Sequence, residues 1–189
     1  GVKMSPTPQI SVSPMWTDTH AHLCDAKFDT DRSEMFRRAA QNTVHTIVEI
    51  ADSPADWSKA SALCSEQSVK VHWSCGFHPH YAQDFSEEKI AQMTREAASP
   101  GCVAIGEIGL DYFKSTASKE DHQKLFLRAL ETASELNKPV VIHCRDAQAD
   151  TLRILRSFFS GLARRDLCIG VIHCFSGDIS FAEGCLDLG

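Results

Sequence analysis

Two histidines separated by one residue, His20 and His22, are the first side chains in this chain whose spacing could support metal chemistry. Side chains alternate between the faces of a β-strand, so both imidazoles would point to the same side of a strand. Glu107, His143 and His173 add three candidate ligands within or directly after apolar runs. Imidazoles and carboxylates bind the divalent cations of hydrolases. The set predicts a binuclear metal hydrolase, whereas the alternative for the histidine pair is two polar residues at a strand end.

Glu107 follows the apolar run that starts at Cys102, and glycines at 106 and 109 indicate tight backbone geometry around it. A carboxylate at the end of a buried strand is costly unless it is paired or bound to metal. In one interpretation Glu107 bridges two cations about 3.5 to 4 Å apart. In the other it forms a salt bridge with a lysine or arginine.

His143 and Arg145 have the same strand parity, and Cys144 lies between them with the opposite parity. This pattern predicts a metal ligand and an anion-binding guanidinium on one face, with the thiol buried under the helices. Cys174 follows His173 in the same way, so both cysteines are predicted to be packed core residues rather than nucleophiles. Asp146 would then serve to fix Arg145.

His78 and His80 flank Pro79 after a predicted strand. An imidazole at that place could bind a phosphate or assist proton transfer, and it could also serve only to order the loop. Asp111 could orient a ligand from behind or cap a turn. The remaining histidines considered have no partner motif and are expected in structural or surface roles: His45, His72 and His122. The tryptophans are expected in the core: Trp16, Trp57 and Trp73.

Short apolar runs that are rich in Val and Ile must position these side chains. They are nearly continuous rather than alternating, as in the strands of a parallel sheet buried on both faces. The runs are Trp16 to Leu23, Val44 to Ala51, Val69 to Phe77, Cys102 to Ile108, Pro139 to Cys144 and Cys168 to Phe175.

Helix signals lie between these runs. Ser53 and Pro54 predict the start of a helix over 55–68, and Ser118 with the acidic residues after it resembles a capping box before a helix that Pro139 ends. The strand–helix unit recurs about every 30 residues, which predicts an α/β fold, a TIM (β/α)8-type barrel. Only about six units are present, so the barrel is expected to be truncated, with its C-terminal strands missing.

The composition predicts a single domain over 16–189 behind a flexible N-terminal tail over 1–15. A net charge of −6 argues against a broad basic surface of the kind that binds nucleic acid non-specifically. The cysteines have no zinc-cluster or secreted-scaffold spacing and are expected to be reduced. With no signal peptide or membrane span in view, the cytoplasm is the expected location, or else the nucleus.

Several motifs together resemble the TatD family of metal-dependent deoxyribonucleases, which are TIM barrels of the amidohydrolase type. They occur in the family's order and cover essentially the whole chain after Met15. The motifs are Asp18-Thr19-His20-Ala21-His22-Leu23, Gly76-Phe77-His78-Pro79-His80, Ala104 to Tyr112, Ile142-His143-Cys144-Arg145-Asp146-Ala147 and His173-Cys174-Phe175-Ser176-Gly177.

The resemblance implies a hydrolase that cleaves DNA phosphodiester bonds, often from a 3′ end, with two divalent metal ions. It implies that His20 and His22 bind the first metal, that Glu107 bridges, and that the second metal is bound by His143 and His173. Mg²⁺ is usual in the family, although imidazole ligands suit Zn²⁺ or Mn²⁺ at least as well. His78 and Arg145 are the expected substrate-binding residues.

The family also has a catalytic aspartate on its last strand, for which this chain has no counterpart. Asp187 lies in a different context, at a predicted helix end. Two alternatives therefore stand beside the nuclease: another amidohydrolase-type enzyme acting on a small ester or cyclic amide, and a catalytically silent truncated form. Open strand edges also predict self-association, unless the chain is a fragment of a longer protein.

Overall fold

A computed structural model describes residues 14–66, 68–160 and 169–189. The predicted flexible tail falls largely on residues 1–13, which lie outside this range. All six apolar runs contain strands: β1 (Trp16–Ala21), β2 (Val44–Ala51), β3 (Lys70–Cys75), β4 (Cys102–Asp111), β5 (Val140–Arg145) and β6 (Gly170–Ile172).

The strands alternate with helices and short 3-10 turns along the described chain. These are η1 (Ala26–Phe28), α1 (Arg32–Gln41), α2 (Pro54–Leu63), η2 (Pro79–Asp84), α3 (Glu87–Ala97), α4 (Lys119–Glu135), α5 (Gln148–Phe159) and α6 (Ile179–Leu186). The predicted α/β class and the strand–helix repeat are confirmed.

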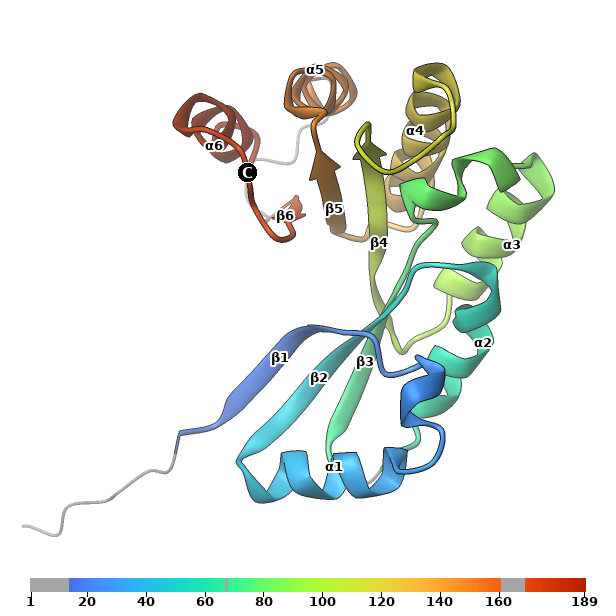
Figure 1. The fold of residues 1–189 in the computed structure, drawn as a ribbon, viewed down its shortest axis with the longest axis vertical. Coiled ribbons are helices and arrows are strands. Elements are labelled where there is room, and N and C mark those ends of the chain that lie inside the picture. Colours follow the sequence, from blue (N-terminus) through green and yellow to red (C-terminus); the bar gives the residue numbers. More distant parts are fainter. Residues whose placement is uncertain (1–13, 67, 161–168) are drawn as a thin grey trace, which may run out of the picture.

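The sheet is parallel throughout and follows the chain order β1-β2-β3-β4-β5-β6. It curls, and the helices pack along its outer side, as in part of a TIM-type barrel (Figure 1). Among the described residues β1 pairs only with β2, and β6 pairs only with β5. Parallel strands all end at the same edge of a sheet, so the loops after them share one end of the molecule.

The strands differ in burial more than the apolar runs predict. All residues of β4 except Val103 are buried, as expected for a central parallel strand. The first four residues of β1 are exposed, and Trp16 is 58% exposed instead of lying in the core. The reason is that β1 is an edge strand, whereas Trp57 and Trp73 are fully buried as predicted.

Two helix ends differ from the prediction. α2 ends at Leu63 rather than near residue 68, because the amides of Ser65 and Glu66 bond to carbonyls three residues back in tight turns. α4 starts at the predicted cap, where Ser118 accepts a hydrogen bond from the Asp121 amide. It ends at Glu135, before Pro139, and Asn137 takes a left-handed conformation (φ 54°) that terminates the helix.

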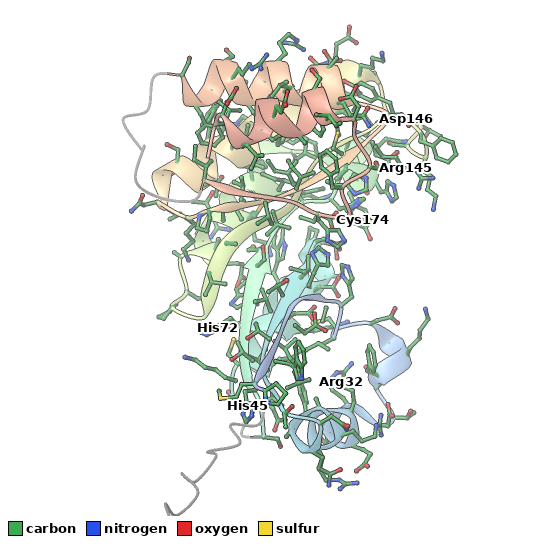
Figure 2. The ribbon with its side chains drawn as sticks, turned by 90° about the vertical axis from the view of Figure 1, so that its left-hand side faces the viewer. Arg32, His45, His72, Arg145, Asp146 and Cys174 are labelled. Carbon is green, nitrogen blue, oxygen red and sulfur yellow. The ribbon has the colours of Figure 1, made fainter. Side chains whose placement is uncertain are left out.

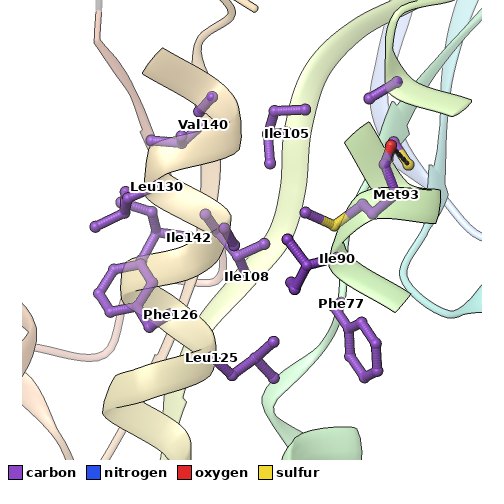
Figure 3. Packing of buried hydrophobic residues seen from close by; sticks show 14 of the residues in the cluster. Phe77, Ile90, Met93, Ile105, Ile108, Leu125, Phe126, Leu130, Val140 and Ile142 are labelled. Carbon is purple, nitrogen blue, oxygen red and sulfur yellow. Dashed lines mark hydrogen bonds between the residues drawn. The ribbon is translucent and has the colours of Figure 1, made fainter. Parts of the chain in front are cut away.

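The main core lies between the sheet and its covering helices. Figure 3 shows Leu125, Phe126 and Leu130 of α4 packed beside Ile105 and Ile108 of β4. These α4 residues recur at three- to four-residue steps, which gives the helix the apolar face predicted from the sequence. A smaller cluster covers the β1–β2 end and contains Leu23, Phe36, Ile47, Val69 and Val71.

Cys144 and Cys174 have different environments. Cys144 is buried, and its Sγ accepts a hydrogen bond from Thr151 of α5, so the prediction of a packed thiol is confirmed. Cys174 is exposed, so the same prediction is wrong for it. The strand before it ends at Ile172, and Cys174 lies in the following turn with φ 47°.

Over the part of the chain that is described, no helix combines the length and apolar character that crossing a membrane requires.

We expect Ile105→Ala to lower the free energy of unfolding by about 2–5 kcal/mol, because Ile105 is fully buried in the main core. Urea unfolding followed by circular dichroism would measure the change. The matched control is Leu127→Ala on the outer face of α4, where the side chain is 42% exposed and the expected change is within about 0.5 kcal/mol. Equal losses in the two variants would contradict this account of the core.

Candidate metal centre

The polar side chains singled out in the sequence gather where the strands end. His20 lies near the end of β1, Glu107 and Asp111 belong to β4, and His143 lies near the end of β5. Figure 2 shows Arg145, Asp146 and Cys174 toward one end of the molecule, while His45 and His72 lie toward the other. His45 and His72 therefore lie away from the cluster, as the sequence predicted.

The first group of metal-competent atoms comes from His20, His22 and Glu107. The two imidazoles are 5.2 Å apart between centroids, so they do point to one site. His20 Nε2 is 3.3 Å from Glu107 Oε2, yet it is buried and has no hydrogen-bond partner among the described residues. A buried ring nitrogen without a partner aims at the space that a cation would fill.

The second group comes from His78, Glu107 and His143. His143 Nδ1 is 2.9 Å from Glu107 Oε1, the oxygen opposite the one that faces His20. One carboxylate thus presents one oxygen to each group. This is the arrangement that a carboxylate bridging two cations requires.

His173 does not join the second group. Its ring stacks on that of His20, with 3.4 Å between the centroids and an interplanar angle of 7°. The residue follows β6 directly, and its amide bonds to the carbonyl of Ile142. The structure therefore places His173 beside the first histidine pair rather than next to His143.

Glu107 lies in the middle of β4 rather than at its end, because β4 continues to Asp111. The pairing with β5 is irregular between Gly106 and Ile108, which turns this part of the strand. A side chain at Gly109, where φ is 141°, would collide with the carbonyl of His143. The close strand contact that aims the carboxylate therefore depends on glycine.

No lysine or arginine pairs with Glu107 within the described ranges, so the salt-bridge alternative is wrong there. Glu107 is only 3% exposed, and this burial raises the pKa of its carboxyl group. The neighbouring imidazoles of His143 and His20 outweigh burial and bring the pKa well below its ordinary value. The centre therefore holds a buried negative charge surrounded by imidazoles.

Asp111 supports the second group from behind. Its Oδ2 accepts from His143 Nε2 at 3.0 Å and from His80 Nε2 at 2.9 Å. Its Oδ1 accepts the amides of Phe113 and Lys114, so it also fixes the loop after β4. Both alternatives from the sequence therefore apply, because the residue orients an imidazole and caps a turn.

His78 is buried, and its Nδ1 accepts the amide of His80 at 3.1 Å. Burial lowers the pKa of His78 to about 3, so the ring is neutral at physiological pH. In a neutral imidazole whose Nδ1 accepts, the proton is on Nε2. His78 therefore offers the site a hydrogen-bond donor, which suits a phosphate oxygen better than a cation.

Arg145 lies at the end of β5, two residues beyond His143. It makes no ion pair with Asp146 in the part of the chain that is described, so the idea that Asp146 fixes it is wrong. Instead the guanidinium lies over the ring of Phe113, with 4.1 Å between Cζ and the ring centroid. Its positive charge therefore remains free to meet an anion.

Glu49 and Asp52 are site neighbours that the sequence reasoning missed. Glu49 is fully buried in β2, where its carboxylate accepts the amides of Leu23 and Cys24 and so fixes the turn after His22. Burial raises the pKa of Asp52 to about 6, against the opposing effect of His22. Glu49 is the one acidic residue in the apolar run of β2, and a lone carboxylate in a buried strand is the sequence feature that could have indicated its role.

The donor set fits a divalent cation. Imidazole nitrogens with one carboxylate suit Zn²⁺ or Mn²⁺, whereas Mg²⁺ prefers oxygen ligands. The unpartnered His20 Nε2 and the anionic Glu107 would both be satisfied by a cation between them. The residues present therefore fit the group that the motifs predict.

Comparisons with known proteins agree with this chemistry. The model of the family described as "TatD related DNase" matches residues 17–189. The chain is 33% identical over 174 residues to a Bacillus subtilis protein named uncharacterized metal-dependent hydrolase YabD, covering 92% of this chain and 66% of that one. It is also 33% identical over 172 residues to the 3′-5′ ssDNA/RNA exonuclease TatD of Pantoea vagans, covering 91% and 64% respectively.

The fold is similar to that of the TatD homologue YjjV from Escherichia coli. The TM-score is 0.80 at 28% identity, with 92% of this chain and 65% of that one covered. The chain thus spans just under two thirds of the length of the curated relatives it matches, 66% for YabD and 64% for the exonuclease.

We expect His20→Ala to weaken Zn²⁺ binding by at least about 10- to 100-fold, because the first group loses one of its three ligands. Competition with a chromophoric chelator would measure the affinity, and metal analysis after gel filtration would give the stoichiometry. His45→Ala, an exposed histidine of β2, is the matched control and should bind as the unchanged chain does. Unaltered affinity in His20→Ala would contradict the assignment.

Proposed function

The chain belongs to the TatD related DNase family, and from this premise we propose that it hydrolyses phosphodiester bonds of DNA from the 3′ end with two divalent cations. The observation that carries the proposal is Glu107, which offers one oxygen to each of two histidine groups. Relatives named 3′-5′ ssDNA/RNA exonuclease support the substrate class, and relatives named metal-dependent hydrolase support the cation.

His20, His22 and Glu107 would hold the first cation, and Glu107 with His143 would hold the second. His173, stacked on His20, lies within the same cluster and is the further ligand that the motifs predict. When bound, the cations would lower the pKa of a water molecule so that hydroxide is available near neutral pH. The protein's part is to hold the ligands in place before substrate arrives, through Asp111 and Glu49.

The phosphate would meet two donors of this chain. His78 offers its Nε2 proton, and Arg145 offers a guanidinium that no described carboxylate neutralises. Both would act on the non-bridging oxygens, where negative charge grows during the attack on phosphorus. None of these groups distinguishes one base from another, so cleavage is expected to be independent of sequence.

We also expect a cytoplasmic or nuclear location. Self-association follows from the edges of β1 and β6, each of which has one paired side in the described structure. Light scattering of the purified chain would measure its oligomeric state.

With Mg²⁺, Mn²⁺ or Zn²⁺ added, we expect the chain to shorten a single-stranded oligonucleotide from its 3′ end, and chelation by EDTA to abolish the reaction. Oligonucleotides labelled at the 5′ end, with a free or a blocked 3′ terminus, would reveal the direction on a denaturing gel. The blocked substrate is the control and should be spared.

The same preparation would be given small carboxylic esters, cyclic amides and phosphotriesters, which test another amidohydrolase-type reaction. Turnover of one of these without cleavage of DNA under any metal would contradict the nuclease proposal. Turnover of no substrate in any panel would contradict it as well and would favour a catalytically silent chain.

We expect His78→Ala to lower kcat for oligonucleotide cleavage by about 10²- to 10³-fold, the range for loss of one donor to a developing oxyanion. Because His78 donates rather than ligates in this assignment, the metal content of the variant should be unchanged. His72→Ala, within β3 and six residues before His78, is the matched control, because it lies away from the cluster. Loss of a bound metal ion in His78→Ala would contradict the donor role.

A further inference from the structure

Phe113 is an aromatic residue that the roles assigned so far leave unused. It lies two residues after the end of β4, and its side chain is 60% exposed. One exposed aromatic side chain is not by itself a binding surface, so its neighbours decide whether it can bind a ligand. Within the described ranges, three of the four exposed aromatic residues follow the carboxyl ends of strands, namely Tyr81, Phe113 and Phe175.

Arg145 covers one face of the Phe113 ring at 4.1 Å. This cation–π contact fixes both side chains and leaves the other parts of the ring accessible, as the exposed fraction requires. An arginine and an aromatic ring in contact present flat surfaces together with positive charge. Such a pair suits a ligand that is itself flat and linked to phosphate.

The loop that carries Phe113 is attached directly to the metal centre. Asp111 accepts the Phe113 amide at 3.0 Å through one oxygen and His143 Nε2 at 3.0 Å through the other. A single carboxylate therefore fixes both the imidazole and the backbone beneath the aromatic ring. A ligand on Phe113 would be held at a set place relative to the cations.

Charge separates this side of the centre from the other. Beside His22, a polar cavity of about 340 Å³ is lined by acidic residues, Asp25, Glu49, Asp52 and Asp56, with Lys59. On the β4–β5 side the guanidinium of Arg145 lies over Phe113 and forms no ion pair in the described ranges, and the exposed Lys114 follows Phe113. The acidic side beside His22 repels a nucleic-acid backbone, and the β4–β5 side with Arg145 and Lys114 attracts it.

We infer that Phe113, with Arg145 behind it, is a stacking platform for a nucleobase of a single-stranded nucleic acid whose phosphate is bound at the metal centre. This inference rests on the proposed function and adds the nucleotide site to it. The net charge of −6 gives the protein no broad electrostatic attraction for DNA beyond the centre itself, so base stacking would add affinity that charge does not supply. Stacking also tolerates every base, which agrees with cleavage independent of sequence.

Binding would be measured with a thymidine oligonucleotide of about ten nucleotides that carries phosphorothioate linkages and so resists hydrolysis. An abasic oligonucleotide with the same backbone separates base stacking from phosphate binding. We expect Phe113→Ala to weaken binding of the first about 5- to 100-fold and of the second by less than about twofold. The matched control, Leu127→Ala, removes another exposed apolar side chain, from α4, and should change neither.

Phe113→Trp supplies a second readout, because the indole fluorescence should be quenched by the thymidine oligonucleotide and not by the abasic one. Leu127→Trp should be quenched by neither. If Phe113→Ala weakened binding of the two oligonucleotides equally, or of neither, the stacking platform would be overturned. Equal quenching of the tryptophan fluorescence at positions 113 and 127 would overturn it as well. These measurements require no turnover, so a failure of stacking is distinguished from a failure of the hydrolysis proposed above.

Discussion

A negative charge buried in the middle of β4 is the constraint on which the rest of the site depends. Glu107 cannot be hydrated where it lies, and no lysine or arginine in the described chain reaches it. Only imidazoles face its two oxygens, and one of them, His20, leaves a buried nitrogen without a hydrogen bond. Such an arrangement is costly in a folded protein unless cations complete it. Cation binding therefore explains this arrangement better than a contribution to the stability of the fold does.

Two further carboxylates, which are not candidate ligands, hold the residues around this centre in place. Glu49 holds the turn after His22 by two backbone amides, and Asp111 holds His143 together with the loop after β4. Both are buried and both belong to strands, so the ligands are attached to the most rigid part of the fold. The close contact between β4 and β5 at Gly109 also brings the backbone of His143 next to the strand that carries Glu107. The positions of the candidate ligands are therefore set by the strands that carry them.

The curl of the parallel sheet explains how residues more than a hundred positions apart form one site. His20 near the end of β1 and His173 after β6 stack on each other, although β1 and β6 do not pair in the described structure. A flat sheet would keep its two edges far apart, whereas the twist of successive strands bends them toward each other. The helices on the outer side maintain that curvature by covering one face only (Figure 1).

The alternation of strands and helices, the parallel sheet and the residue types of the site could all be predicted from the sequence. These follow from local signals, namely continuous apolar runs, helix caps and a two-residue strand period that placed His20 with His22. The exposure of Trp16 and Cys174 could not be predicted, because it depends on which strand lies at an edge, for Trp16, and on where a strand ends, for Cys174. Nor could the sequence assign His78 a donor role, pair Asp111 with His143 or set Arg145 on Phe113. The last two contacts join β5 to β4 or to the loop after it, and the burial that keeps His78 neutral comes from the elements packed around its loop. Both depend on which parts of the chain meet in space, which local sequence patterns do not specify.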